Sequence, residues 1–248
     1  MSFEFIAPDA AQPVNGTRPA LRSPIEWALR DQGANFTERA GWRMVTDYGN
    51  PSAELAACRD SVGVADLSFL GKLELQADPG IVSGIVAELT HGGALAPGQA
   101  RLHEEVWWCP MTLGRVLVLA PPERTAELRE LVEAAASAAP FASVIEMTAA
   151  YGSNALVGPL ARESFARTMA LDLRPDHFAE GGFAPVSVAR TPGMVLHQGP
   201  DLFLHLFGAG FAYYVWTVFV DAVRHLGGRA VGTTALRART TAEEGVHA

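Results

Sequence analysis

The order of strand-like and helix-like segments is the feature of this sequence that most constrains its fold. From residue 51 onward, apolar periodicity predicts helices over 51–62, 78–90 and 122–139, a strand over 64–76 and two strands over 105–121. After Pro140 the strand–helix–strand–strand–helix order returns with one further strand before the last helix, and the predicted segments are 143–158, 159–171, 183–190, 193–198, 201–208 and 210–227. Because helices alternate with paired strands, the sequence predicts an α+β fold of two related half-domains with antiparallel or mixed sheets and flanking helices.

The region before residue 50 predicts one short helix. Ser23 is placed as its N-cap, Pro24 as its first helical residue and Glu26 three residues after the cap, and Gly33 ends it. Residues 1–21 are rich in Pro, Ala and Gly and show no period, so we expect an N-terminal arm there and a tail over 241–248. The domain is then expected over 22–240, with halves at about 50–140 and 141–235.

Charge and composition exclude several function classes. The chain has 19 Lys and Arg against 27 Asp and Glu, a net charge of −8, and no basic run. A nucleic-acid groove or an anionic membrane surface needs concentrated positive charge, so we expect neither partner. The apolar stretch over 203–223 contains His205 and Asp221 and is typical of a strand, a turn and a helix, not of a membrane span. Cys58 and Cys109 are not spaced as a redox or zinc pair, and no secretory signal is evident, so a cytoplasmic protein with reduced thiols is expected.

One region of the sequence matches a known family motif without a gap. The motif has a helix, then GA-x-F-x-x-x-AGW-x-M-x-x-x-Y, then E-x-x-x-x-R-x-x-x-G-x-x-D-[LV]-S. The matching residues are Gly33, Phe36, Ala40, Gly41, Trp42, Met44, Tyr48, Glu54, Arg59, Gly63, Asp66 and Ser68. Further on, LTHGGALAPGQA, ALVGPLAR and the Leu236-Arg237 pair match later family segments. The chain therefore resembles the aminomethyltransferase (glycine-cleavage T protein) family over about residues 22–239.

The resemblance implies the folate-binding domain of that family, in which two α+β halves face each other around a central channel for tetrahydrofolate. We expect the family's C-terminal barrel to be lacking. This domain content favours the gamma subunit of heterotetrameric sarcosine oxidase, although the AGWRM segment is more similar to the T protein. Glycines and packing residues of the motif need only a retained fold, so they indicate ancestry and not activity.

The carboxylates with which the family works on folate are missing. The family has an aspartate in a GG-x-x-DD strand, but no aspartate occurs here between Asp78 and Asp172. Glu104 and Glu105 precede the matching strand, and they either replace that aspartate or form a solvated turn. The family also holds the pterin ring with the glutamate of a GYTGE loop, which is deleted here.

What replaces that loop is HQGPDLFLH, residues 197–205. His197 stands where the family has arginine, and Asp201 is a candidate replacement for the lost glutamate. Losing one carboxylate leaves buried pterin donors unpaired, at a cost of about 1–3 kcal/mol. Tetrahydrofolate is therefore a doubtful cofactor, and no metal is expected.

The remaining candidates for lining a ligand channel come from the same comparison of motifs and from side-chain chemistry. Leu70 and Leu102 replace a family methionine and tyrosine, and Arg237 faces either an anionic group or the surface. Of Trp107 and Trp108, strand alternation predicts one in the core and one available for contact. The other candidates are His103 and Tyr151. A metal site built from His103, His197 and His205 has little support, because no HxH or HxxxH pair occurs.

Two functions follow from this pattern. The first is a non-catalytic or divergent subunit that supports a flavin-dependent amine oxidase or demethylase, with a flavoprotein large subunit or further copies of itself as partner. The alternative is a stand-alone tetrahydrofolate-dependent aminomethyl- or methyl-transferase that kept the cavity and changed its polar groups.

Overall fold

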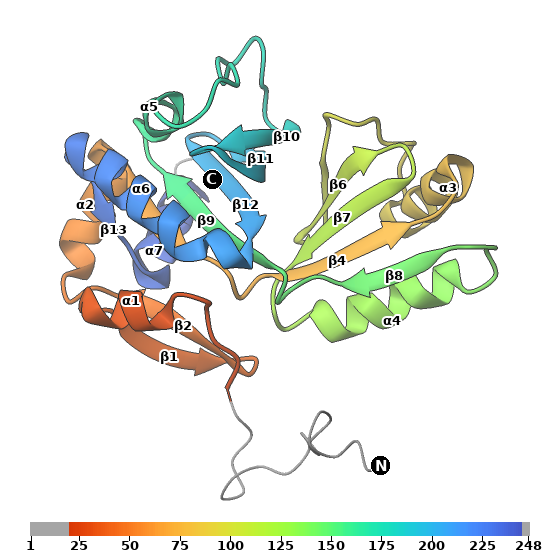
Figure 1. Ribbon diagram of the computed structural model, residues 1–248, viewed down its shortest axis with the longest axis horizontal. Coiled ribbons are helices and arrows are strands. Elements are labelled where there is room, and N and C mark those ends of the chain that lie inside the picture. Colours follow the sequence, from red (N-terminus) through yellow and green to blue (C-terminus); the bar gives the residue numbers. More distant parts are fainter. Residues whose placement is uncertain (1–19, 245–248) are drawn as a thin grey trace, which may run out of the picture.

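The protein has two lobes, each built on a β-sheet with helices on its outer face (Figure 1). The computed structural model describes residues 20–244, and most of the expected arm and the end of the expected tail lie outside the described residues. The mixed α+β class agrees with the sequence expectation. Among the described residues, no helix combines the length and the apolar run that a membrane crossing needs.

The larger lobe contains a six-stranded sheet in the order β10-β11-β12-β9-β3-β13. Its strands are β3 (Gly63–Asp66), β9 (Tyr151–Val157), β10 (Phe183–Val188), β11 (Thr191–Gly199), β12 (Leu202–Gly208) and β13 (Arg229–Ala230). All neighbours are antiparallel except the β13–β3 pair, so the sheet is mixed. The helices α1 (Glu26–Asp31), α5 (Ala161–Ala166) and α6 (Ala212–His225) contribute residues to the core on its outer face.

The smaller lobe contains a five-stranded antiparallel sheet in the order β5-β6-β7-β4-β8. Its strands are β4 (Gly71–Gln76), β5 (Arg101–His103), β6 (Val106–Thr112), β7 (Arg115–Ala120) and β8 (Ser143–Glu146). The helices α3 (Pro79–Thr90) and α4 (Thr125–Ala136) cover one face and build a core with Leu73, Trp108 and Val118.

Two predicted strands are each divided in the structure. The segment 64–76 forms β3 and β4 with a turn at 67–70, and 143–158 forms β8 and β9 with a turn at 147–150. In both cases the two strands join different sheets. The alternation of apolar and polar residues continues across each turn, because the strands on both sides of it have a buried face. The sequence pattern alone therefore did not reveal the turns.

Near the N-terminus, the predicted helix start was wrong by two residues. The chain makes a turn at 24–25 and α1 begins at Glu26, while the Ser23 hydroxyl accepts a bond from the Ile25 N–H at 3.3 Å. A hairpin follows that was not predicted, β1 (Asn35–Arg39) and β2 (Trp42–Asp47). Its turn residues Ala40 and Gly41 have φ of 49° and 77°, the backbone of a tight hairpin turn.

The remaining helices pack against these elements. Helix α2 (Pro51–Asp60) begins as predicted, with the Asn50 side chain accepting from the Ala53 N–H at 3.0 Å. The predicted helix over 159–171 is shorter, because α5 ends at Ala166. The 3-10 turn η2 (Ala209–Phe211) leads into α6, and α7 (Thr233–Glu244) packs on α2.

Candidate functional site

The inner faces of the two sheets meet through an apolar cluster, to which α2 and α7 also contribute Cys58 and Ala235. The smaller sheet contributes Cys109, Leu117 and Leu119, and the larger sheet contributes side chains such as Leu196 and Leu204. We call this the inter-sheet cluster. Trp107 and Tyr151 pack against it as half-buried residues. Apolar side chains therefore fill the contact between the two sheets.

A cavity of about 530 Å³ borders the inter-sheet cluster. Its lining residues are Leu95, Gln99, Ala100, Arg101, Leu102, Trp107, Glu180, Gly181 and Gln198. We call it the Trp107 cavity. It brings together two of the predicted residues, Leu102 and Trp107, which are register partners in the β5–β6 pair.

The Trp107 cavity depends on a contact between the lobes. The Ala100 N–H donates to the Gly181 carbonyl at 2.6 Å, and the Phe183 N–H donates to the Gly98 carbonyl at 3.1 Å. These bonds hold the strand leading into β5 against the edge of the larger sheet. Gln99 and Gly182 form an isolated antiparallel bridge at the same place.

The polar groups of the Trp107 cavity are two amides, one guanidinium and one carboxylate. Arg101 donates through Nη1 to the Thr90 hydroxyl at 3.1 Å and to the Gly93 carbonyl at 2.7 Å, so its position is fixed. Glu180 is solvent-exposed. The sequence did not single out Gln99, Glu180 or Gln198 as cavity residues. Gln99 and Gln198 stand in two of the compared segments, LTHGGALAPGQA and HQGPDLFLH, but about 80 to 100 residues of chain separate Gln99 from the other two.

A second cavity, of about 240 Å³, brings together Leu70 and Arg237. We call it the Leu70 cavity. Its lining residues are Arg39, Met44, Leu67, Phe69, Leu70, Pro121, Pro122, Glu123, Thr233, Leu236 and Arg237. The lining is apolar apart from Thr233 and the charged side chains, and an ion pair joins Arg39 to Glu123.

Buried polar groups hold the wall of the Leu70 cavity in place. The fully buried Lys72 donates through Nζ to the carbonyls of Ser68 and Leu70 at 3.0 and 2.7 Å. The Ser68 hydroxyl donates to the Asp66 carboxylate at 2.6 Å. Burial lowers the pKa of Lys72 to about 7 and raises the pKa of Asp66. Both shifts follow from the cost of burying a charge.

Glu104 and Glu105 lie in the β5–β6 turn, outside both cavities. Their φ angles are 46° and 66°, and both side chains are exposed. Glu104 pairs with Arg124 at 3.6 Å. The neighbouring His103 packs edge-on against His91 with ring centroids 5.7 Å apart. The geometry of this turn is that of a solvated hairpin end.

His197 and Asp201 lie away from the Trp107 cavity and the Leu70 cavity. His197 is buried, its Nδ1 lies 3.0 Å from the Phe178 carbonyl, and its ring stacks on Phe203 at 4.4 Å. The Asp201 carboxylate lies 3.5 Å from Arg162 Nη1. Neither residue lines the Trp107 cavity or the Leu70 cavity.

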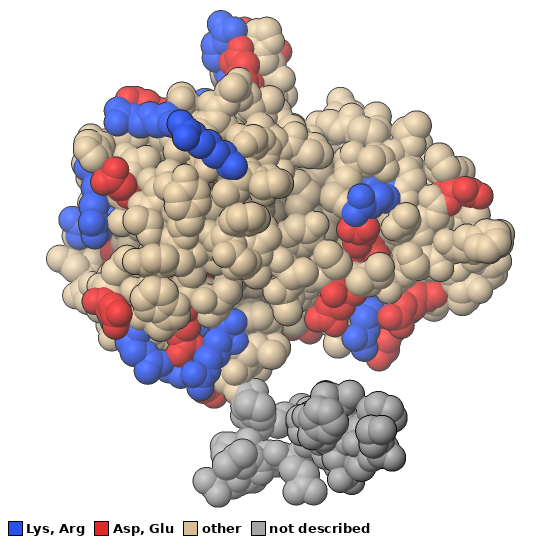
Figure 2. Space-filling view, in the orientation of Figure 1, with Lys and Arg blue, Asp and Glu red and all other residues tan. Residues whose placement is uncertain are grey.

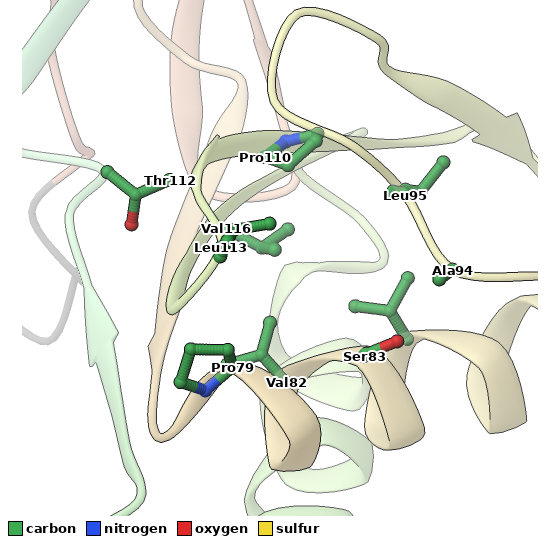
Figure 3. Close-up of a pocket in the computed structure, with 10 residues that line it drawn as sticks. Pro79, Val82, Ser83, Ala94, Leu95, Pro110, Thr112, Leu113 and Val116 are labelled. Carbon is green, nitrogen blue, oxygen red and sulfur yellow. The ribbon is translucent and has the colours of Figure 1, made fainter.

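Trp108 belongs to the core of the smaller lobe, on the opposite face of β6 from Trp107. A third cavity of about 90 Å³ lies between α3 and the β6–β7 hairpin, with Pro79 and Val82 facing Pro110 and Leu113 (Figure 3). None of its lining residues titrates, so it has no group for acid–base chemistry. Within residues 20–244 no three His, Cys, Asp or Glu side chains are grouped as metal ligands.

Family residues with buried polar roles explain why the motif is retained. The buried Glu54 carboxylate accepts from the Tyr48 N–H at 2.6 Å and the Gly232 N–H at 2.9 Å. Gly158 has a φ of 131°, and a Cβ there would lie 2.4 Å from the Ser61 carbonyl oxygen. These residues join segments that are far apart in sequence.

Comparisons with known proteins agree with this architecture. The chain is 39% identical over 82 residues to the aminomethyltransferase of Mycobacterium leprae (strain TN), a match covering 33% of this chain and 22% of that protein. It is 29% identical over 230 residues to the aminomethyltransferase of Mycobacterium avium (strain 104), covering 86% of this chain and 60% of the relative. The chain thus spans less than two thirds of the length of these relatives. No protein-family model matches it.

Two solved structures share the fold. The aminomethyltransferase T of the Bartonella henselae glycine cleavage system has a TM-score of 0.72 at 18% identity, covering 87% of this chain and 60% of that one. A chain of the heterotetrameric sarcosine oxidase from Corynebacterium sp. U-96, in complex with pyrrole 2-carboxylate, has a TM-score of 0.62 at 22% identity. That match covers 72% of this chain and 93% of the other. The chain is therefore similar in sequence to aminomethyltransferases, and it shares the fold of the Bartonella henselae aminomethyltransferase T and of a sarcosine oxidase chain.

Proposed function

We propose that this protein is a divergent, non-catalytic subunit that supports a flavin-dependent amine oxidase or demethylase in cytoplasmic one-carbon or amine metabolism. The observation that carries the proposal is the placement of the candidate replacement carboxylates. Glu104 and Glu105 lie in an exposed turn, and Asp201 faces Arg162. A general base or an ion partner must lie within hydrogen-bond reach of the reacting group, and none of these three lines the Trp107 cavity or the Leu70 cavity.

The match to sarcosine oxidase supports a subunit role. It covers 93% of a chain that belongs to a heterotetramer. On this proposal the partner is a larger flavoprotein chain, and association with further copies of itself is the alternative arrangement.

The side chains present do not fit tetrahydrofolate in the way the family resemblance implies. That mode needs a carboxylate to accept two parallel bonds from the pterin ring. The Trp107 cavity offers amides from Gln99 and Gln198, and its one carboxylate, Glu180, is exposed. We therefore assign no reaction step to folate.

A second candidate function is a stand-alone tetrahydrofolate-dependent aminomethyl- or methyl-transferase. The size of the Trp107 cavity favours it, because about 530 Å³ is within the range of small-molecule sites. In this case Trp107 would stack on a flat ligand while Gln99 and Gln198 bond its edge.

Calorimetry with tetrahydrofolate, combined with the size of the protein isolated from its native cells, separates the two functions. The subunit proposal predicts no saturable heat, no turnover, and a native assembly larger than one chain that contains flavin. A folate-binding monomer with turnover would overturn it. Glu180→Gln and Gln198→Ala then test the second function, since either change must weaken folate binding if the Trp107 cavity holds it.

A further inference from the structure

Four large aromatic side chains are exposed together on the outer side of α1, η2 and the start of α6. Trp27, Tyr213, Tyr214 and Phe211 have exposed fractions of 55%, 53%, 48% and 46%. The rings of Trp27 and Tyr213 touch, with centroids 4.8 Å apart. Phe211 and Tyr214 form a second exposed pair three residues apart at the helix start, and Tyr214 directly follows Tyr213 in the chain. We call these four residues the aromatic surface.

These side chains are not needed to attach the helices to the sheet. Helix α1 and the residue before it pack on the core through Ile25, Ala28 and Leu29, and α6 through residues that include Val215 and Trp216. The indole N–H of Trp216 also donates to the Gln32 side chain at 3.2 Å, which joins the two helices. The aromatic surface is therefore a second, outward face of elements whose inward face is already buried.

The size of the aromatic surface is that of an interface centre. A large aromatic side chain offers about 150–250 Å², so four that are half exposed present roughly 400 Å². An ordinary protein interface covers about 800 Å² on each partner, with an apolar centre inside a polar rim. The aromatic surface matches such a centre, and Trp and Tyr are the residues most enriched at binding hot spots.

The charges beside the aromatic surface are mostly positive. The buried Glu26 carboxylate is contacted by Arg22 at 3.8 Å, Arg30 at 2.6 Å and Arg43 at 3.1 Å. Together with the exposed Asp31 at the end of α1, three cations and two carboxylates leave a local charge of +1, whereas the whole chain carries −8. Arg30 follows Trp27 by three residues, so both lie on the same side of α1. Figure 2 shows that a broad uncharged area covers the larger lobe and that basic residues, with acidic ones between them, lie along its lower edge.

The positive charge beside the aromatic surface favours one kind of binding partner over another. A second copy that paired symmetrically through the same surface would bring two positive rims together, which is unfavourable. A partner with carboxylates around an apolar centre would pair with both parts of the surface.

We propose that the aromatic surface and its arginines dock a different protein chain, whose contact surface has an apolar centre and an acidic rim. The inference rests on the proposed subunit function and names the surface by which the subunit attaches. It places attachment on α1 and α6, on the opposite face of the larger sheet from the inter-sheet cluster.

Hydroxyl-radical footprinting tests this directly. The assembly purified from the native cells and the isolated chain are oxidised under the same conditions, and oxidation of each residue is measured by mass spectrometry. We expect Trp27 and Tyr213 to be protected about fivefold or more in the assembly, as buried interface centres are. Phe141, 98% exposed in the smaller lobe, is the matched control and is expected to stay equally reactive.

Three other results of the footprinting experiment are possible, and each overturns either the docking surface or the subunit function. An assembly in which Trp27 and Tyr213 stay fully reactive overturns the docking surface and leaves the subunit function standing. Protection in the isolated chain that grows with concentration shows a second copy as the occupant. A chain that runs alone in its native cells overturns the subunit function and the docking surface with it.

Variants give a second, independent measurement with the purified subunits. Trp27→Ser with Tyr213→Ser is expected to weaken association about 30-fold or more. Arg22→Glu with Arg30→Glu is expected to weaken it most at low salt, because the rim acts through charge. Leu113→Ser, a change at an exposed leucine of the smaller lobe, is expected to leave it unaltered. Circular dichroism confirms that each variant is folded, and unchanged affinity in the Trp27 and Tyr213 variant overturns the proposal.

Discussion

Trp107 and Trp108 are neighbours in β6 and lie on opposite faces of the five-stranded sheet. The Trp108 indole is 2% exposed in the core of the smaller lobe, and the Trp107 indole lines the Trp107 cavity. Trp108→Ala should therefore lower the free energy of unfolding by about 3–5 kcal/mol, the usual cost of emptying a large buried site. Trp107→Ala should cost clearly less. Urea unfolding of the two variants checks this, and equal losses would contradict the assigned faces.

Lys72 gives stability a defined dependence on pH. Its pKa is about 7 in the folded protein and 10.5 as the ordinary value, so between these limits the unfolded chain binds more protons. Stability should then rise with pH through this window. Burial raises the pKa of the Cys58 thiol from 9.0 to about 11, which opposes the trend above pH 9.

The clean interval for Lys72 is therefore pH 7 to 9. Urea unfolding at several pH values should show stability rising in the wild type by up to about 1 kcal/mol per pH unit. In Lys72→Met this rise should be lost or reduced. The same slope in both proteins would show that Lys72 is not the titrating group.

His205 should make the protein sensitive to acid. It is fully buried, both ring nitrogens lack a partner among the described residues, and burial lowers its pKa from 6.5 to about 3. The folded state thus binds fewer protons than the unfolded state between pH 3 and 6.5, and stability falls as pH drops through this range. His205→Leu should lose less stability between pH 7 and pH 5 than the wild type. Unfolding curves at those two pH values decide it, and a larger loss in the variant would be inconsistent with a neutral buried ring.

Gly158 should tolerate no side chain. Its φ of 131° and the 2.4 Å approach of a Cβ to the Ser61 carbonyl predict strain and a backbone clash in Gly158→Ala. We expect a loss of about 2–4 kcal/mol, seen as a lower melting temperature. Gly210→Ala is the matched control, because no atom lies within 4 Å of its added Cβ. A similar shift in both variants would mean that general glycine effects, and not this geometry, set the cost.

The long helices and the buried faces of the strands could be predicted from the sequence, because capping residues and apolar periodicity are local features of the chain. Helix α2 has its Asn50 cap and Pro51 at its first position, and α6 has its apolar stripe. The breaks at 67–70 and 147–150 did not follow. The first of these turns is held by the buried Lys72 and Ser68, which read in sequence as part of an alternating strand.

The candidate site was only partly predictable for a related reason. Motif comparison named Leu102 and Trp107, which form one pair in the β5–β6 hairpin. It included Gln99 in a compared segment but did not single out Gln99 or Glu180 for the site, because they meet only through the contact between Ala100 and Gly181. Such a pairing between the lobes leaves no periodic trace in the chain.

The two sheets also exchange strands. β3 lies before residue 140 in the chain but pairs with β9 and β13 in the larger sheet, and β8 lies after it but pairs with β4 in the smaller one. A cut near Pro140 would thus leave each fragment without a strand of its own sheet and with a surplus strand of the other. The lobes are interlocked, so they should melt in one cooperative step, and neither fragment should be soluble when produced without the other.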